Sequence, residues 1–203
     1  MLHLVRHAEC EKNLIGIPGG AGAPLTARGV AQAKCIASKL GELIGGQPLL
    51  VACPAIQTVA TAEIIGGHLG LSPSQDQLLA SIHLGELTGV RIDEARERYP
   101  ESSQSMDLWR AGALEIADLT IRGMEEPWEF YRRGAQFLLR YSTKDEIIVC
   151  CTTSIMILLS YLALGITPHS GDGYKVLSFE NVEHRKFSIS EETLASAAAL
   201  LRA

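Results

Sequence analysis

The chain has 203 residues, 47% of them hydrophobic, and a formal net charge of −5 at pH 7. A chain of this length and composition buries one sizeable core, which favours a single domain over residues 1–203. The mild acidity and the lack of a block of lysines or arginines argue against nucleic-acid binding as the main role.

Strands and helices alternate along the predicted elements. In chain order we expect a strand at 1–5, a Gly/Pro-rich loop at 13–24, a helix at 26–44, a strand at 48–53, a helix at 54–70, a helix at 126–142, a strand at 145–151, a helix at 152–165, and edge strands at 173–182 and 184–190. Thr26 is the expected N-cap of the first helix, and Pro54 is expected in the first turn of the second. Residues 80–123 mix loop and helix and are predicted to form a lid or insertion.

The periodicity of the first helix predicts its buried face. Apolar residues recur there at helical spacing, and they are Val30, Ala33, Ile36, Ala37, Leu40 and Leu43.

This alternation predicts an α/β three-layer sandwich, with a mostly parallel central sheet and helices on both faces. In such a sheet, ligands bind at the carboxyl ends of the strands. Residues 6–10, 52–57 and 150–154 all follow or end predicted strands, so we expect the functional site where these three segments meet.

The five cysteines show no Cys-x-x-Cys spacing, and their number is odd. Cys150 and Cys151 are expected on opposite faces of one strand, so they are unsuited to chelating one metal ion. This pattern, together with an N-terminus that lacks the features of a signal peptide, predicts reduced thiols in a cytoplasmic protein. The longest apolar run, residues 154–166, is too short and interrupted to span a bilayer, so no membrane role is expected.

Four segments resemble the motifs of one family, in that family's order. LVRHAECEKN (4–13), PLTARGVAQA (24–33), IHLGELTG (82–89) and EEPWEFYRRGAQFL (125–138) are similar to motifs of the histidine phosphatase (phosphoglycerate mutase-like) superfamily. The resemblance implies the α/β fold of this superfamily. It also implies a reaction in which a neutral histidine attacks phosphorus while two arginines and a second histidine hold the phosphoryl oxygens. It implies a carboxylic acid that protonates the leaving alcohol, and neither a metal nor a cofactor.

Three residues match the family's pattern in the first motif. The resemblance makes His7 the nucleophile, Arg6 the first arginine and Asn13 a further phosphate ligand. Together they predict a strand end that binds a small phosphorylated or otherwise anionic ligand, because fixed donors must meet the negative charge of such a group.

Three further positions depart from that pattern. Gln57 stands where the second arginine is expected, Ser81 where the general acid is expected, and Cys151 where the second histidine is expected, with Thr152 in place of the following glycine. A charge-assisted hydrogen bond to an anion contributes about 1.5–3 kcal/mol, so these changes predict a large loss of hydrolytic rate.

Neighbouring residues offer two alternatives. His83 and Glu86 lie near Ser81 along the chain and are candidate ligand-binding residues, with Glu86 a candidate substitute acid. The alternative, which we favour, is that Glu86 is a solvated loop residue and that His83 packs at the edge of the loop. Cys151 at the start of a helix is a candidate nucleophile, and the more common alternative is a buried, inert thiol.

We therefore expect a divergent histidine phosphatase-fold protein, close to a pseudoenzyme, that keeps the anion-binding strand end and has reduced or lost phosphomonoesterase activity. Two alternatives stay open: an active phosphatase that forms a phosphohistidine at His7, and an enzyme of different chemistry, elimination or isomerisation, that uses His7 as a base. The sequence specifies neither the ligand nor the assembly state, and a homodimer is one of the assemblies it permits.

Overall fold

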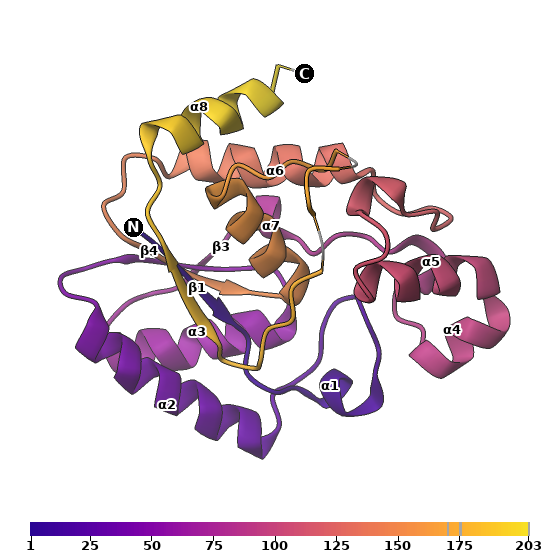
Figure 1. The fold of residues 1–203 in the computed structure, drawn as a ribbon. Coiled ribbons are helices and arrows are strands. Elements are labelled where there is room, and N and C mark those ends of the chain that lie inside the picture. The colour runs from indigo at the N-terminus through magenta and orange to yellow at the C-terminus, as the bar shows by residue number, and fades with distance from the viewer. Residues whose placement is uncertain (170, 175, 203) are drawn as a thin grey trace.

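A five-stranded, mostly parallel sheet forms the middle layer of the protein, and helices cover both of its faces (Figure 1). The computed structural model describes residues 1–169, 171–174 and 176–202. This is the three-layer α/β architecture that the alternation of strands and helices predicts, and that prediction is confirmed.

The strands are β1 (Leu2–Arg6), β2 (Leu49–Ala52), β3 (Ser74–Gln75), β4 (Ile147–Cys151) and β5 (His184–Phe187). The helices are α1 (Glu11–Ile15), α2 (Ala27–Leu43), α3 (Ile56–Leu69), α4 (Ile92–Arg98), α5 (Pro100–Arg110), α6 (Pro127–Arg140), α7 (Thr153–Ala163) and α8 (Glu191–Leu200). Short 3-10 turns lie at Gln77–Leu79, Gly85–Leu87 and Ile116–Asp118.

The strand order is β3-β2-β4-β1-β5, and the carboxyl ends of the central strands β1, β2 and β4 lie at the same edge of the sheet. β1 and β4 run parallel with Arg6 opposite Cys151, and β2 and β4 run parallel with Ala52 opposite Cys150. β5 closes the sheet as an antiparallel edge strand beside β1, as expected for residues 184–190. The segments that follow β1, β2 and β4 therefore meet, as the sequence predicts.

Each face of the sheet has its own hydrophobic core. Helices α2 and α3 pack on one face, where Cys150 is buried, and α6, α7 and α8 pack on the other, where Cys151 is buried. The two adjacent cysteines thus lie on opposite faces, which confirms that expectation, and all five cysteines are free thiols.

Helix α2 shows why the local sequence folds as it does. The hydroxyl of Thr26 accepts a hydrogen bond from the Gly29 N–H at 2.9 Å, which confirms the expected N-cap. Ala33, Ile36, Ala37 and Leu40 are buried as the periodicity predicts. The prediction is wrong for Leu43, which is 53% exposed, because Ile44 takes the buried place at the end of the helix.

The expectation of a strand at 173–182 is wrong for the described residues of that segment, which form no strand. Tyr174 and Phe179 are buried against the α6–α8 face instead, and the Arg6 side chain donates a hydrogen bond to the Phe179 carbonyl oxygen.

Other element boundaries also differ from the prediction. Pro54 precedes the N-cap residue Ala55, so it lies just outside the first turn of α3. Helices α1 and α8 and strand β3 were not expected from the sequence.

Residues 80–123 lie to one side of the sheet and contain α4 and α5 (Figure 1). They have a small core of their own, made by Leu87, Ala95, Met106 and Ile121. Their mixture of loop and helix agrees with the sequence, and their role as a lid stays a prediction. No helix in the described ranges is long and apolar enough to cross a membrane.

Candidate functional site

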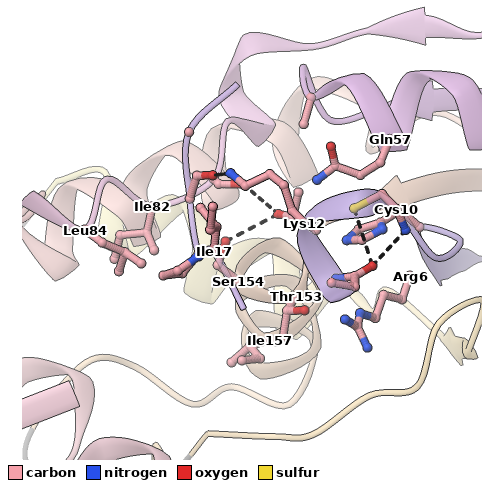
Figure 2. A pocket seen from close by; sticks show the side chains of 18 of the residues that line it. Arg6, Cys10, Lys12, Ile17, Gln57, Ile82, Leu84, Thr153, Ser154 and Ile157 are labelled. Atoms are coloured by element: carbon pink, nitrogen blue, oxygen red, sulfur yellow. Dashed lines mark hydrogen bonds between the residues drawn. The ribbon is translucent and has the colours of Figure 1, made fainter. Parts of the chain in front are cut away.

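A cavity of about 290 Å³ opens where the carboxyl ends of β1 and β4 meet α1, the start of α3 and the end of α5 (Figure 2). This volume is in the range of sites that hold a small metabolite. The polar side chains of its lining come from residues far apart in the chain, and they are Arg6, His7, Cys10, Lys12, Asn13, Gln57, Ser81, Arg110, Thr152, Thr153 and Ser154. None of the described residues that line it is an aspartate or a glutamate.

His7 is held in one tautomer. Its side chain lies directly after β1 and is only 4% exposed, and its Nδ1 lies 2.8 Å from the carbonyl oxygen of Ala8. A carbonyl oxygen can only accept, so Nδ1 carries the hydrogen and Nε2 keeps its lone pair. The pKa of His7 falls to about 4, mainly because the side chain is buried and to a smaller extent because of the positive charge of Arg6. His7 is therefore neutral at pH 7.

Arg6 supplies a positive charge beside His7. Its Nη1 donates to the carbonyl oxygen of Phe179, and no described carboxylate lies within ion-pairing distance of it. Its Nε is buried without a hydrogen-bond partner among the described residues. Burial lowers the pKa of Arg6, but a guanidinium stays charged in proteins, so this cation is available to an anionic ligand.

Two amide side chains on the cavity wall have a fixed orientation. The Oε1 of Gln57 accepts from the Ala23 N–H at 3.2 Å, and the Oδ1 of Asn13 accepts from the Cys10 N–H at 3.0 Å. Because each oxygen is held by a backbone donor, each amide leaves its two N–H groups for other acceptors. Gln57 and Asn13 thus present neutral donors at a site that already contains Arg6.

A row of hydroxyl groups also lines the cavity. Ser81 Oγ donates to Thr152 Oγ1 at 2.8 Å, and Thr152 Oγ1 lies 3.4 Å from Ser154 Oγ. All three side chains line the cavity, and Figure 2 labels Ser154 among them. Hydroxyl groups donate and accept hydrogen bonds, but they are too weakly acidic to protonate a departing alkoxide at neutral pH.

Cys151 does not border the cavity, and this corrects the position assigned from the sequence. Its side chain is fully buried in the α6–α8 core, where Sγ lies 3.3 Å from the Val149 carbonyl oxygen, while Thr152 lines the cavity one residue later. Burial raises the pKa of the Cys151 thiol well above its ordinary value, which contradicts a reactive thiolate. The reason is geometric: successive side chains of a strand point to opposite faces, so a shift of one residue changes the environment completely.

His83 and Glu86 also lie outside the lining of this cavity. His83 is exposed, and its Nδ1 accepts a hydrogen bond from the backbone nitrogen of Gly85 at 3.1 Å. Glu86 accepts a hydrogen bond from Ser102 Oγ at 2.7 Å, which ties the turn at 85–87 to α5. Glu86 therefore makes a structural hydrogen bond within the 80–123 segment, which agrees with the favoured prediction that it is a loop residue and not an acid of the site.

Two cations of the cavity were missed in the sequence. Lys12 lies on α1, directly before the loop expected at 13–24, and Arg110 lies at the end of α5. The Arg110 guanidinium is 3.8 Å from Asp107, a carboxylate that already accepts two hydrogen bonds from Arg96. Lys12 is only five residues after His7, and this closeness in the chain was the one signal available. The sequence does not indicate that the Lys12 side chain turns toward the site.

Asn181 is a further contact that the sequence did not indicate. Its Nδ2 donates to the His7 carbonyl oxygen at 3.0 Å and lies 3.4 Å from Asn13 Oδ1. It therefore holds the end of β1 to α1. In the described part of the chain, no group of three or more His, Cys, Asp or Glu residues is arranged to hold a metal ion.

Comparison with known proteins gives consistent matches. A family model described as histidine phosphatase superfamily (branch 1) matches residues 2–197. Phosphoserine phosphatase 1 of Hydrogenobacter thermophilus is 28% identical over 166 residues, which is 80% of this chain and 75% of that protein. A mycobacterial glucosyl-3-phosphoglycerate phosphatase in complex with VO3 superposes with a TM-score of 0.75 at 21% identity, over 90% of each chain. A putative alpha-ribazole-5'-P phosphatase from Escherichia coli has a TM-score of 0.67 at 21% identity, over 81% of this chain and 79% of that one.

Proposed function

The chain belongs to the histidine phosphatase superfamily (branch 1), and from that membership we propose that it binds a small phosphorylated or otherwise anionic molecule at Arg6 and His7. We propose further that its phosphomonoesterase activity is reduced, so that turnover depends on how good the leaving group is. The observation that carries this proposal is the composition of the cavity. It contains cations and a neutral histidine, but no carboxylic acid among its described residues.

The first chemical step follows from the state of His7. Nε2 has a free lone pair because Nδ1–H is bonded to Ala8, so Nε2 is the atom that attacks phosphorus. Arg6, with the amide groups of Asn13 and Gln57, would hold the phosphoryl oxygens. Donors fixed in advance stabilise the spread negative charge of the transition state without reorganisation.

The second half of the reaction is where this site is weakest. A positioned general acid contributes about 10²- to 10⁴-fold to rate, and Ser81 and Thr152 cannot act as one. Gln57 offers hydrogen bonds without charge, and a charge-assisted bond is worth about 1.5–3 kcal/mol. Esters whose leaving group departs without a proton should therefore be hydrolysed far better than alkyl phosphates.

The relatives support a phosphoryl ligand in general terms. The sequence relative is a phosphoserine phosphatase, and the structure of the mycobacterial phosphatase contains VO3. The alternative of elimination or isomerisation was motivated by a loss of positive charge, and Lys12 and Arg110 restore cations to the cavity. A phosphorylated ligand is thus favoured over a less charged one.

The test is turnover of an aryl phosphate by the purified protein, run beside His7→Ala. We expect slow release of phosphate from 4-nitrophenyl phosphate that is abolished in His7→Ala, and a higher melting temperature of the wild-type protein in inorganic phosphate. Activity that survives His7→Ala would contradict the nucleophile. Stabilisation by phosphate without any turnover would leave the protein an anion-binding domain, and neither stabilisation nor turnover would contradict the proposed ligand class.

The cytoplasmic location expected from the cysteine pattern stays a prediction, as does a homodimeric assembly.

A further inference from the structure

The ammonium group of Lys12 lies in the cavity without a carboxylate partner. No ion pair joins it to any described acidic residue, and its one hydrogen bond to the described chain is donated by Nζ to the carbonyl oxygen of Gly19. An ammonium has three N–H donors, so two are left for a ligand. Burial lowers the pKa of Lys12, which is the response of an amine that is partly removed from water.

The position of Nζ places it on the Ser81 side of the cavity. Nζ lies 3.3 Å from the point that a Cβ on Gly20 would occupy, and Gly20 lines a smaller neighbouring cavity together with Ser81, Ile82 and Thr88. Figure 2 shows the Lys12 side chain extending from α1 past Gln57 toward Ile17 and Ile82, on the side away from Arg6. Arg6 and Lys12 thus approach the cavity from different sides.

This separation assigns different partners to the two cations. Arg6 lies beside His7 and meets the phosphoryl group that His7 attacks. In an in-line displacement the leaving oxygen departs on the side opposite the nucleophile. Ser81 marks that side, since it occupies the position at which the family's general acid is expected.

We propose, building on the proposed function, that Lys12 is the catalytic residue that stabilises and protonates the leaving-group oxygen in place of the missing carboxylic acid. As Nε2 of His7 forms its bond to phosphorus, the phosphorus–oxygen ester bond breaks and its electron pair stays on the leaving oxygen. Nζ–H of Lys12 gives that oxygen a proton and becomes a neutral amine. In the second step the oxygen of a water molecule bonds to phosphorus, and the phosphorus–nitrogen bond breaks with its electron pair returning to Nε2 of His7. The amine takes a proton from that water, which releases inorganic phosphate and restores the ammonium.

The inference concerns the leaving group, so the test varies the leaving group. kcat/KM is measured for wild type, Lys12→Met and Lys12→Arg on 2,4-dinitrophenyl phosphate, 4-nitrophenyl phosphate and phenyl phosphate. The matched control is Lys34→Met, which removes an exposed lysine of α2 that does not line the cavity. Melting temperature and the affinity for inorganic phosphate are measured for every variant, so that loss of folding or of anion binding is recognised.

We expect Lys12→Met to lower kcat/KM on phenyl phosphate by about 100-fold and on 2,4-dinitrophenyl phosphate by less than about threefold, because only the poor leaving group needs the proton. The affinity for phosphate should stay within about twofold. Lys12→Arg should keep the charge without giving up a proton, so it should not restore turnover of phenyl phosphate. The fall of wild-type activity at alkaline pH should disappear in Lys12→Met.

Two failures are distinguishable. If His7-dependent turnover is present but Lys12→Met slows all three esters equally, or none of them, then Lys12 does not act on the leaving group, and the proposed function stands. If the wild-type protein hydrolyses none of the esters, or hydrolyses them equally well as His7→Ala, then His7 is not a nucleophile toward them, and both the role of Lys12 and the proposed phosphatase activity are overturned. The affinity for inorganic phosphate then decides separately whether the proposed anion binding stands.

Discussion

The adjacent residues Cys151 and Thr152 lie in opposite surroundings, so replacing each by histidine tests which of them borders the ligand site. Cys151 is fully buried in the α6–α8 core. An imidazole there overfills packed space, which costs about 1–3 kcal/mol, and it buries a ring N–H without a partner, at about 1–3 kcal/mol more. We expect Cys151→His to lower the free energy of unfolding by about 2–6 kcal/mol.

The same replacement one residue later should be mild. Thr152 borders a cavity of about 290 Å³, into which an imidazole has room to extend. The main loss is the hydrogen bond from Ser81 at 2.8 Å, worth about 0.5–1.5 kcal/mol. Ser81 and Ser154 both line the cavity, so water can take over that bond.

The assay is urea unfolding at pH 7, followed by the fluorescence of Trp109 and Trp128. Cys35→His, at an exposed position of α2, is the control and should change the free energy of unfolding by no more than about 0.5 kcal/mol. Equal destabilisation at Cys151 and Thr152, or a larger loss at Thr152, would refute the assignment of Thr152 to the cavity.

The assignment also decides which restored site should work. We expect Gln57→Arg and Ser81→Glu combined with Thr152→His to raise phenyl phosphate turnover, and the same pair combined with Cys151→His not to do so. Two regained charge-assisted bonds at about 1.5–3 kcal/mol each amount to about 150- to 25,000-fold in rate. A restored triple variant that folds and binds phosphate but gains no activity would contradict the idea of a phosphatase weakened only by these substitutions.

Three further outcomes are expected in urea unfolding. Gly29→Ala should lose about 1–3 kcal/mol, because its Cβ meets the backbone carbonyl of Glu9, whereas Gly67→Ala, with open space around it, should gain about 0.5–1 kcal/mol. Between pH 6.5 and 4 the unfolded chain binds a proton at His7, whereas the folded protein, in which the pKa of His7 is about 4, does not. As the pH is lowered through this range, the free energy of unfolding of the wild type should therefore decrease by up to about 1.4 kcal/mol per pH unit more than that of His7→Ala. Asp76→Asn should cost about 1–3 kcal/mol, since this buried carboxylate accepts an arginine and a tyrosine bond, and a loss below about 0.5 kcal/mol would contradict that reading.

The sequence alone determined the architecture and the edge of the sheet at which the site lies. Strands that alternate with helices along the chain pack as a sheet covered by helices, because each element must bury its apolar face. Since β1, β2 and β4 run parallel, their carboxyl ends lie together at one edge of the sheet. The sequence also predicted the N-cap at Thr26 and the position of the adjacent residues Arg6 and His7 at a strand end. Both features depend only on residues close together in the chain.

Only the tertiary structure decided which side chains form the cavity. The difference between Cys151 and Thr152 is one residue at the point where a strand becomes a helix, and the side chain that faces the site depends on where that turn falls. Lys12 reaches the cavity because α1 forms after β1, and a helix of five residues has too little stability of its own to be read from its sequence. Arg110 arrives from α5, about a hundred positions away from Arg6 in the chain, through packing that no local pattern specifies.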